Sequence, residues 1–238
     1  WPALPGMQGN TRGVWEHSDR GNVAVAVAEA RAERSALGSQ LMARDIGEIL
    51  KDHELSQLAL SLGESAFGDN CATCHGSGGR GAKGYPRLAD DVWLWGGSLA
   101  DIEYTVRHGI RNGGAQARFS EMPAFGRDGF LPADQISDLV EYVTSISGRS
   151  ADTAAAARAA PIFQKECSSC HGVDARGDRT KGSPNLTDAD WLYGGDRASI
   201  RRTIFGPRNG IMPAWQERFD DATIRALAVY VHSLGGGE

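Results

Sequence analysis

The stretch CATCH, from Cys71 to His75, returns as CSSCH, from Cys167 to His171, and the two stretches hold all four cysteines of the 238-residue chain. The pattern C-x-x-C-H is the attachment signature of c-type haem, in which two thiols bond to the macrocycle and the next histidine ligates the iron. Zinc sites and thioredoxin-like redox pairs share the C-x-x-C spacing, and the histidine directly after each pair is what favours haem. The sequence therefore predicts two haem c groups. The predicted attachment residues are Cys71, Cys74, Cys167 and Cys170, and the predicted iron ligands are His75 and His171.

Two of the four methionines stand in matching sequences downstream of these motifs, Met122 in EMPAF and Met212 in IMPAW. A thioether as sixth ligand raises the reduction potential and closes the iron to substrates. Because each methionine follows its own motif, we expect Met122 to serve the haem of His75 and Met212 to serve the haem of His171. Two alternatives stay open: a methionine can be an ordinary core residue, and His108 can replace Met122 as ligand of the first haem.

The likeness between the two halves extends well beyond the motifs. DDVWLWGG at residues 90–97 matches DADWLYGG at 188–195, and each half closes on a segment with helical spacing of apolar residues. Phe67 and Phe163 each stand four residues before the first cysteine of a motif. We expect the first and last helices of each repeat to cross, with Phe67 against Tyr142 and Phe163 against Tyr230.

The repeat divides the chain into an N-terminal arm at 1–62, a first domain at 63–148, a linker at 149–160 and a second domain at 161–238. The arm has long proline-free stretches rich in Ala, Glu, Arg and Leu, which predict one or two helices. It carries no ligand motif, so we expect it to pack against the first domain or another protein. The alanine-rich linker is either flexible or a continuation of helix. The predicted fold class is all-α, with each small domain built around one haem.

Charge and hydropathy exclude some function classes. The net charge of −5 gives no basic surface for nucleic acid. No apolar run reaches the roughly 18–20 residues that cross a bilayer. The chain begins at Trp1 rather than Met. Since haem attachment in bacteria takes place outside the cytoplasm, we expect a signal peptide or an anchor helix ahead of this residue.

A more specific resemblance is carried by longer stretches: AFGDNCATCHGSGGRGAKGYPRL at 66–88, MPAFGRDG at 122–129, SPNLTDADWLYGG at 183–195 and LAVYVHSLGGG at 227–237. With these stretches the chain resembles the dihaem cytochrome c subunit of the cbb-type, or C-family, haem-copper oxidases, known as CcoP or FixP. The similarity covers nearly the whole chain.

The resemblance implies two tandem class I cytochrome c domains, preceded by a helical arm. It also implies a function: relay of single electrons from a donor cytochrome c, through two His/Met haems, toward a monohaem subunit and the oxygen-reducing catalytic subunit. Two six-coordinate irons leave no position for substrate, so the isolated chain is expected not to be an enzyme. The family's N-terminal transmembrane helix is absent here, which implies a soluble part on the periplasmic side of the bacterial inner membrane.

By the same matching, the carbonyls of Pro86 and Pro184 hold the imidazoles of His75 and His171, a contact that fixes the ring orientation and tunes the iron. Four further residues are candidates for binding the haem propionates: Arg111, Arg208, Trp93 and Trp191. For the arginines the alternative is ordinary surface charge, and for the tryptophans it is core packing.

Other function classes share a pair of C-x-x-C-H motifs. A dihaem peroxidase keeps one iron open, which predicts repeats that differ at a ligand position, whereas these repeats are alike there. A free-standing dihaem electron carrier, or the cytochrome subunit of a dehydrogenase, is the remaining alternative to an oxidase subunit.

Overall fold

The computed structural model describes residues 19–238, so Trp1 and Met7 lie outside the described part of the chain. Within that part the regular elements are helices, joined by loops with isolated β-bridges, in agreement with the predicted all-α class. The helices are α1 Asp19–Ala43, α2 Ile46–Ile49, α3 His53–Asn70, α4 Ala72–His75, α5 Leu99–His108, α6 Ala133–Ile146, α7 Thr153–Glu166, α8 Ser168–His171, α9 Arg197–Phe205 and α10 Asp221–Ser233. None of these helices, over residues 19–238, is long and apolar enough to cross a membrane.

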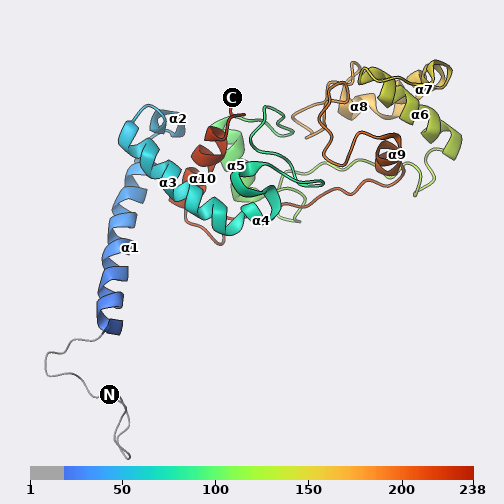
Figure 1. Cartoon of the computed structure of the whole chain (residues 1–238). Coiled ribbons are helices and arrows are strands. Elements are labelled where there is room, and N and C mark those ends of the chain that lie inside the picture. Colours follow the sequence, from blue (N-terminus) through green and yellow to red (C-terminus); the bar gives the residue numbers. More distant parts are fainter. Residues whose placement is uncertain (1–18) are drawn as a thin grey trace, which may run out of the picture.

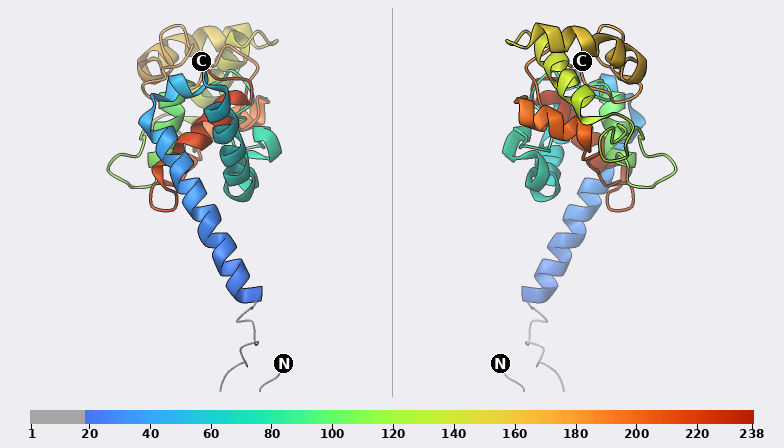
Figure 2. Two further views of the ribbon diagram at one scale, coloured as in Figure 1. Left: turned by 90° about the vertical axis from the view of Figure 1, so that its left-hand side faces the viewer. Right: turned by 90° about the vertical axis from the view of Figure 1, so that its right-hand side faces the viewer.

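The first two helices of the arm, α1 and α2, pack against the body that contains α3, and α3 itself begins at His53 inside the expected arm. Its first helix, α1, projects away from the rest of the molecule, and only its C-terminal end reaches the helices beyond it (Figures 1 and 2). Leu41 in α1 and Ile49 in α2 are fully buried in one apolar cluster with α3 and α10. Arg225 of α10 donates to the carbonyls of Leu41 and Arg44, at 3.1 and 2.8 Å. The arm is therefore tied to α10, a helix from the far end of the chain.

The helices that lead into the two motifs begin at matching aspartate caps. Asp52 accepts the backbone N–H of Glu54 and Leu55 at the start of α3. Asp152 does the same for the first turn of α7. Such caps satisfy N–H groups that have no partner within the helix. Because α7 already begins at Thr153, most of the expected linker at 149–160 is helix, and the helical alternative holds for it.

The last helix of each repeat packs on the first helix of the other repeat. α10 lies against α3 and α5, and α6 lies against α7 and α9. Figure 1 shows the two long connections that run between the bodies, one from α5 to α6 and one from α9 to α10. Each folded body therefore combines helices from both halves of the chain.

The expected aromatic contacts are accordingly wrong in their partners. The ring of Phe67 meets Tyr230, with 5.3 Å between centroids, and Phe163 meets Tyr142 at 4.9 Å. The physical reason lies in the short connection between Ile146 and Thr153, which makes α6 and α7 neighbours in a helical hairpin. The aromatic surfaces of the repeats are alike, so α10 can occupy the matching place on α3.

Candidate functional site

Each C-x-x-C-H motif sits at a sharp junction between two helices. The first cysteine ends the long helix and begins a single turn, so that Cys71 joins α3 to α4 and Cys167 joins α7 to α8. The N–H of each first cysteine donates to the carbonyl of the phenylalanine four residues earlier, at 2.8 and 2.9 Å. All four cysteines, which lie within the described residues, are free thiols. This turn brings two thiols and one imidazole together, as attachment of haem c requires.

The two histidines are held as expected. His75 Nδ1 donates to the Pro86 carbonyl at 3.0 Å, and His171 Nδ1 donates to the Pro184 carbonyl at 3.1 Å. Burial lowers the pKa of both imidazoles, although the carbonyl contact opposes it. Both rings are therefore neutral near pH 7, and the occupied Nδ1 leaves Nε2 free to bind a metal.

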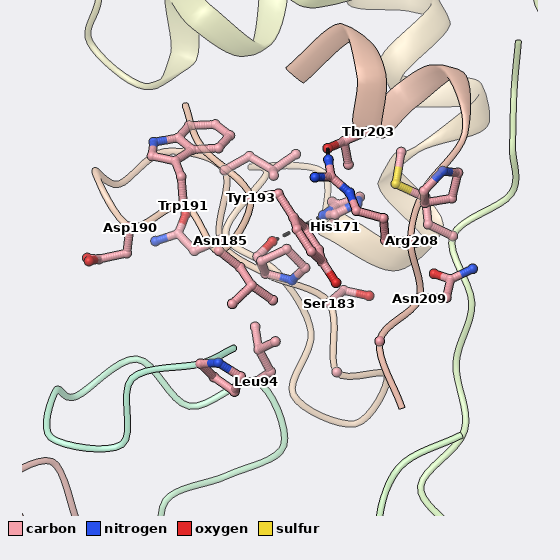
Figure 3. Close-up of a pocket in the computed structure, with 18 of the residues that line it drawn as sticks. Leu94, His171, Ser183, Asn185, Asp190, Trp191, Tyr193, Thr203, Arg208 and Asn209 are labelled. Atoms are coloured by element: carbon pink, nitrogen blue, oxygen red, sulfur yellow. Dashed lines mark hydrogen bonds between the residues drawn. The ribbon is translucent and has the colours of Figure 1, made fainter. Parts of the chain in front are cut away.

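A cavity of about 680 Å³ opens beside the second motif. Figure 3 shows His171 in this cavity with Tyr193, Arg208 and Asn209 around it, and Leu94 approaching from a separate segment. Cys167 and Cys170 line the same space, together with apolar side chains from α6 and α9. A mostly apolar cavity with two thiols and an imidazole at its wall fits a covalently attached haem.

The methionines do not lie where their order in the chain suggests. Met122 lines the cavity of His171 and packs on the core cluster of Phe163, on which Cys167 also packs. Met212 packs on the other core cluster, with Cys71 and Phe67. The placement of both segments differs from the expected grouping of Met122 with His75 and of Met212 with His171, and the ligation of either iron by these methionines stays a prediction. The reason is the same exchange that moves α6 and α10, because each methionine precedes the exchanged helix of its repeat.

The candidate propionate residues have protein partners in this structure. Arg111 donates from Nε to the Gly210 carbonyl at 2.8 Å and from Nη1 to the Ser120 carbonyl at 3.0 Å, and burial lowers its pKa. Arg208 lies over the ring of Tyr193, with 4.0 Å to the centroid. Both arginines line the large cavity, so both are within its wall, and their binding of propionates stays a prediction.

Each of the two tryptophans contacts a residue that is distant in the sequence. Trp93 donates its indole N–H to the Gly236 carbonyl. Trp191 lies under the Arg149 guanidinium, 4.9 Å from ring centroid to Cζ, and packs on the second-motif cluster. Their contact with haem stays a prediction.

His108 is buried at the C-terminal end of α5, with its ring 4.5 Å from Tyr104. It lines a separate cavity of about 340 Å³, together with Ala214 and Gln216. It does not line the cavity that holds Met122. The placement therefore gives no support to His108 as the replacement for Met122.

A pair of contacts between the repeats was not foreseen. The ring of Trp95 lies against Gly182, and the ring of Tyr193 lies against Gly84, so the two matching loops cross reciprocally. The N–H of Gly84 also donates to the Leu192 carbonyl at 2.8 Å. The signal for this contact was present in the aligned WLWGG and WLYGG segments, but an alignment of repeats does not say which copy touches which.

The comparisons with known proteins agree with this site. A family model described as cytochrome c matches residues 60–147, and a model described as cytochrome c oxidase, cbb3-type, subunit III matches residues 154–231. The cbb3-type cytochrome c oxidase subunit CcoP of Cereibacter sphaeroides is 50% identical over 240 residues, which cover 100% of this chain and 82% of the relative. The subunit FixP of Bradyrhizobium diazoefficiens is 46% identical, with 100% and 82% covered, and CcoP of an Azospirillum species is 45% identical, with 100% and 83% covered.

Proposed function

Because this chain belongs to the CcoP/FixP family of cbb3-type cytochrome c oxidase subunits, we propose that it relays single electrons into such an oxidase through two haem c groups. Membership supports the electron-transfer role. The proposal of two haem groups rests on the repeated site, in which a C-x-x-C pair adjoins an imidazole that is hydrogen-bonded to a proline carbonyl.

The residues have distinct tasks at each site. The thiols of Cys71 and Cys74, and of Cys167 and Cys170, form the covalent attachment. His75 and His171 present Nε2 to the iron, since the proline carbonyls occupy Nδ1. When bound, haem c supplies a one-electron Fe(III)/Fe(II) couple whose potential depends on the axial ligands and on burial.

With haem attached, the thioethers of Met122 and Met212 would supply the sixth iron ligands. A filled sixth position excludes oxygen and peroxide, so the chain itself carries out no bond chemistry. The arginines at the cavity wall, Arg111 and Arg208, offer cationic partners to propionates, and Trp93 and Trp191 fix the loops beside them.

The partners follow from the family. We propose that electrons arrive from a donor cytochrome c and leave toward the monohaem and catalytic subunits, on the periplasmic side of the bacterial inner membrane. A membrane anchor ahead of the described region is part of this proposal. A free-standing carrier, a dehydrogenase subunit or a dihaem peroxidase is not favoured by the family to which the chain belongs.

Oxygen consumption by the assembled oxidase tests the function. Replacing all four cysteines by alanine is expected to abolish oxygen uptake driven by a reduced donor cytochrome c, while a small-molecule reductant of the catalytic subunit still supports it. Met42→Ala is a matched control, because Met42 is exposed on α1. Unchanged uptake from the donor cytochrome c in an assembled complex without these haems would contradict the relay.

A further inference from the structure

We infer that the loop that holds His75 is the passage for electrons between the two haem sites, and that Tyr193 is the residue that positions this loop. The inference deepens the proposed function and rests on it, since it takes haem to be attached at both motifs. The step is the transfer of one electron, in which one ferrous iron is oxidised and the other, ferric iron is reduced. No bond forms or breaks, and no proton moves.

The two sites share a wall. Pro86, whose carbonyl accepts a hydrogen bond from His75 Nδ1 at 3.0 Å, also lines the cavity beside His171. Lys83 and Tyr85 of the same loop line this cavity too. A haem held in the cavity would therefore lie against the loop that orients the iron ligand of the other haem. Placing two redox groups relative to each other in this way is the part of electron transfer that the protein supplies.

A backbone hydrogen bond joins this loop to the second repeat. The N–H of Gly84 donates to the Leu192 carbonyl at 2.8 Å. Gly84 stands two residues before Pro86, and Leu192 stands directly before Tyr193. The position of Pro86 at the cavity wall therefore depends on a contact with the segment that carries Tyr193.

The ring of Tyr193 contacts the same loop. Gly84 has a φ of +93°, and a Cβ added to it would lie 3.4 Å from Tyr193 Cε1, so the ring lies close to the backbone of the loop. Arg208 lies over the ring, with 4.0 Å from Cζ to the centroid. Figure 3 shows Tyr193 and Arg208 beside His171 in the cavity. Tyr193 therefore touches the loop of the first site from inside the cavity of the second.

The equivalent aromatic residue of the first repeat has a different setting. Trp95 holds the place of Tyr193 in the aligned segments, and its ring lies against Gly182. The N–H of Gly182, however, donates to the Arg179 carbonyl of its own loop, at 3.4 Å. Among the described residues that line the large cavity, Tyr193 is present and Trp95 is absent. These differences give the bridging position to Tyr193.

Variants at position 193 of the haem-loaded chain test the inference. Tyr193→Leu removes the ring, and Tyr193→Phe keeps the ring without its hydroxyl. After a flash that reduces one haem, we expect electron equilibration between the haems to slow several-fold in Tyr193→Leu and to keep its rate in Tyr193→Phe. Both reduction potentials are measured in each variant, so that rates are compared at equal driving force. Tyr104→Leu is the matched control with an unchanged rate, because Tyr104 lies on α5 and outside the large cavity.

A second readout does not depend on electron transfer. Hydrogen exchange of the Gly84 amide reports whether its bond to the Leu192 carbonyl is closed. We expect Tyr193→Leu to lose protection of this amide, whereas Tyr193→Phe and Tyr104→Leu keep it. The measurement uses the reduced chain, in which the methionine-ligated irons are diamagnetic.

An unchanged equilibration rate in Tyr193→Leu would overturn the inference and leave the relay intact. A slowed rate without loss of Gly84 protection would also overturn it, since the ring would then not act through the loop. Absence of electron equilibration in the unmodified chain would instead overturn the proposed function. Should Tyr193→Leu not fold, Gly84→Ala disturbs the same contact, because alanine rarely adopts a φ of +93° and the loop must shift. An unchanged rate in that variant would refute the inference.

Discussion

A double-mutant cycle between Phe67 and Tyr230 measures whether α3 and α10 are partners. The two rings lie 5.3 Å apart at their centroids and are tilted by 53°. Aromatic pairs in this range contribute about 0.5–1.5 kcal/mol beyond the area that they bury. Phe67 is 2% exposed, so Phe67→Leu is expected to cost about 1–2 kcal/mol of unfolding free energy by itself. With Tyr230→Leu, the double variant is expected to lose less than the sum, by a coupling energy of about 1 kcal/mol.

The matched control uses the partner that the order of the residues predicts. Phe67→Leu and Tyr142→Leu lie in different bodies and are expected to add within about 0.3–0.5 kcal/mol. Tyr142→Leu is instead expected to couple with Phe163→Leu, whose ring lies 4.9 Å from that of Tyr142. The measurement is denaturant unfolding of the haem-loaded chain, followed by far-ultraviolet circular dichroism. Coupling of Phe67 with Tyr142, and additivity of Phe67 with Tyr230, would refute the exchanged packing.

Three further outcomes are expected. Gly63→Ala should destabilise the chain by about 1–2 kcal/mol, because the new Cβ meets the Ala226 backbone and lies 2.6 Å from Tyr230 Cβ, and this overpacking exceeds the gain in helix propensity. Gly68→Ala in the same helix has open space around it and should stabilise the chain by about 0.5 kcal/mol. Equal effects of the two variants on denaturant unfolding would count against the close contact between α3 and α10. Hydrogen bonds from Arg197 lower the pKa of Glu141 to about 2, below its ordinary 4.5, so the carboxylate stabilises the fold above pH 4.5 and loses this contribution as the pH falls through 2. Glu141→Gln should cost about 0.5–1 kcal/mol at pH 7 and nothing well below pH 2, and a cost independent of pH would contradict the ion pair. Asn112→Ala removes the donor to Met212 and should weaken the methionine band of one haem on mild heating, at a cost of about 1–2 kcal/mol, while equal weakening of both bands would speak against a local role.

The local features of the fold could be predicted because their signals are local. The all-α class followed from helical spacing, and the contacts of His75 with Pro86 and of His171 with Pro184 followed from the resemblance to the family, whose proline position these two residues match. In each case the residues that decide the structure lie within about one helix or one loop of each other, and the periodic pattern or the motif already contains them.

The pairing between repeats could not be predicted in the same way. Phe67 and Phe163 stand in equivalent positions, as do Tyr142 and Tyr230, so either closing helix offers a suitable ring to either opening helix. What distinguishes the arrangements is the length of the connections. The segment from Arg111 to Met122 is longer than its counterpart from Arg208 to Met212, and α7 follows α6 after a short turn. These lengths were visible in the sequence, and they favour a hairpin of neighbouring helices over two separate domains.

The central proposal for this protein is that two closed haems, each with a histidine and a methionine, carry the electrons. The most direct test is a visible and near-infrared spectrum of the haem-loaded chain at controlled potential, with carbon monoxide added to the reduced form. We expect a methionine charge-transfer band from both ferric haems and no prompt binding of carbon monoxide by either ferrous haem. One missing band, or rapid carbon monoxide binding at one haem, would contradict it.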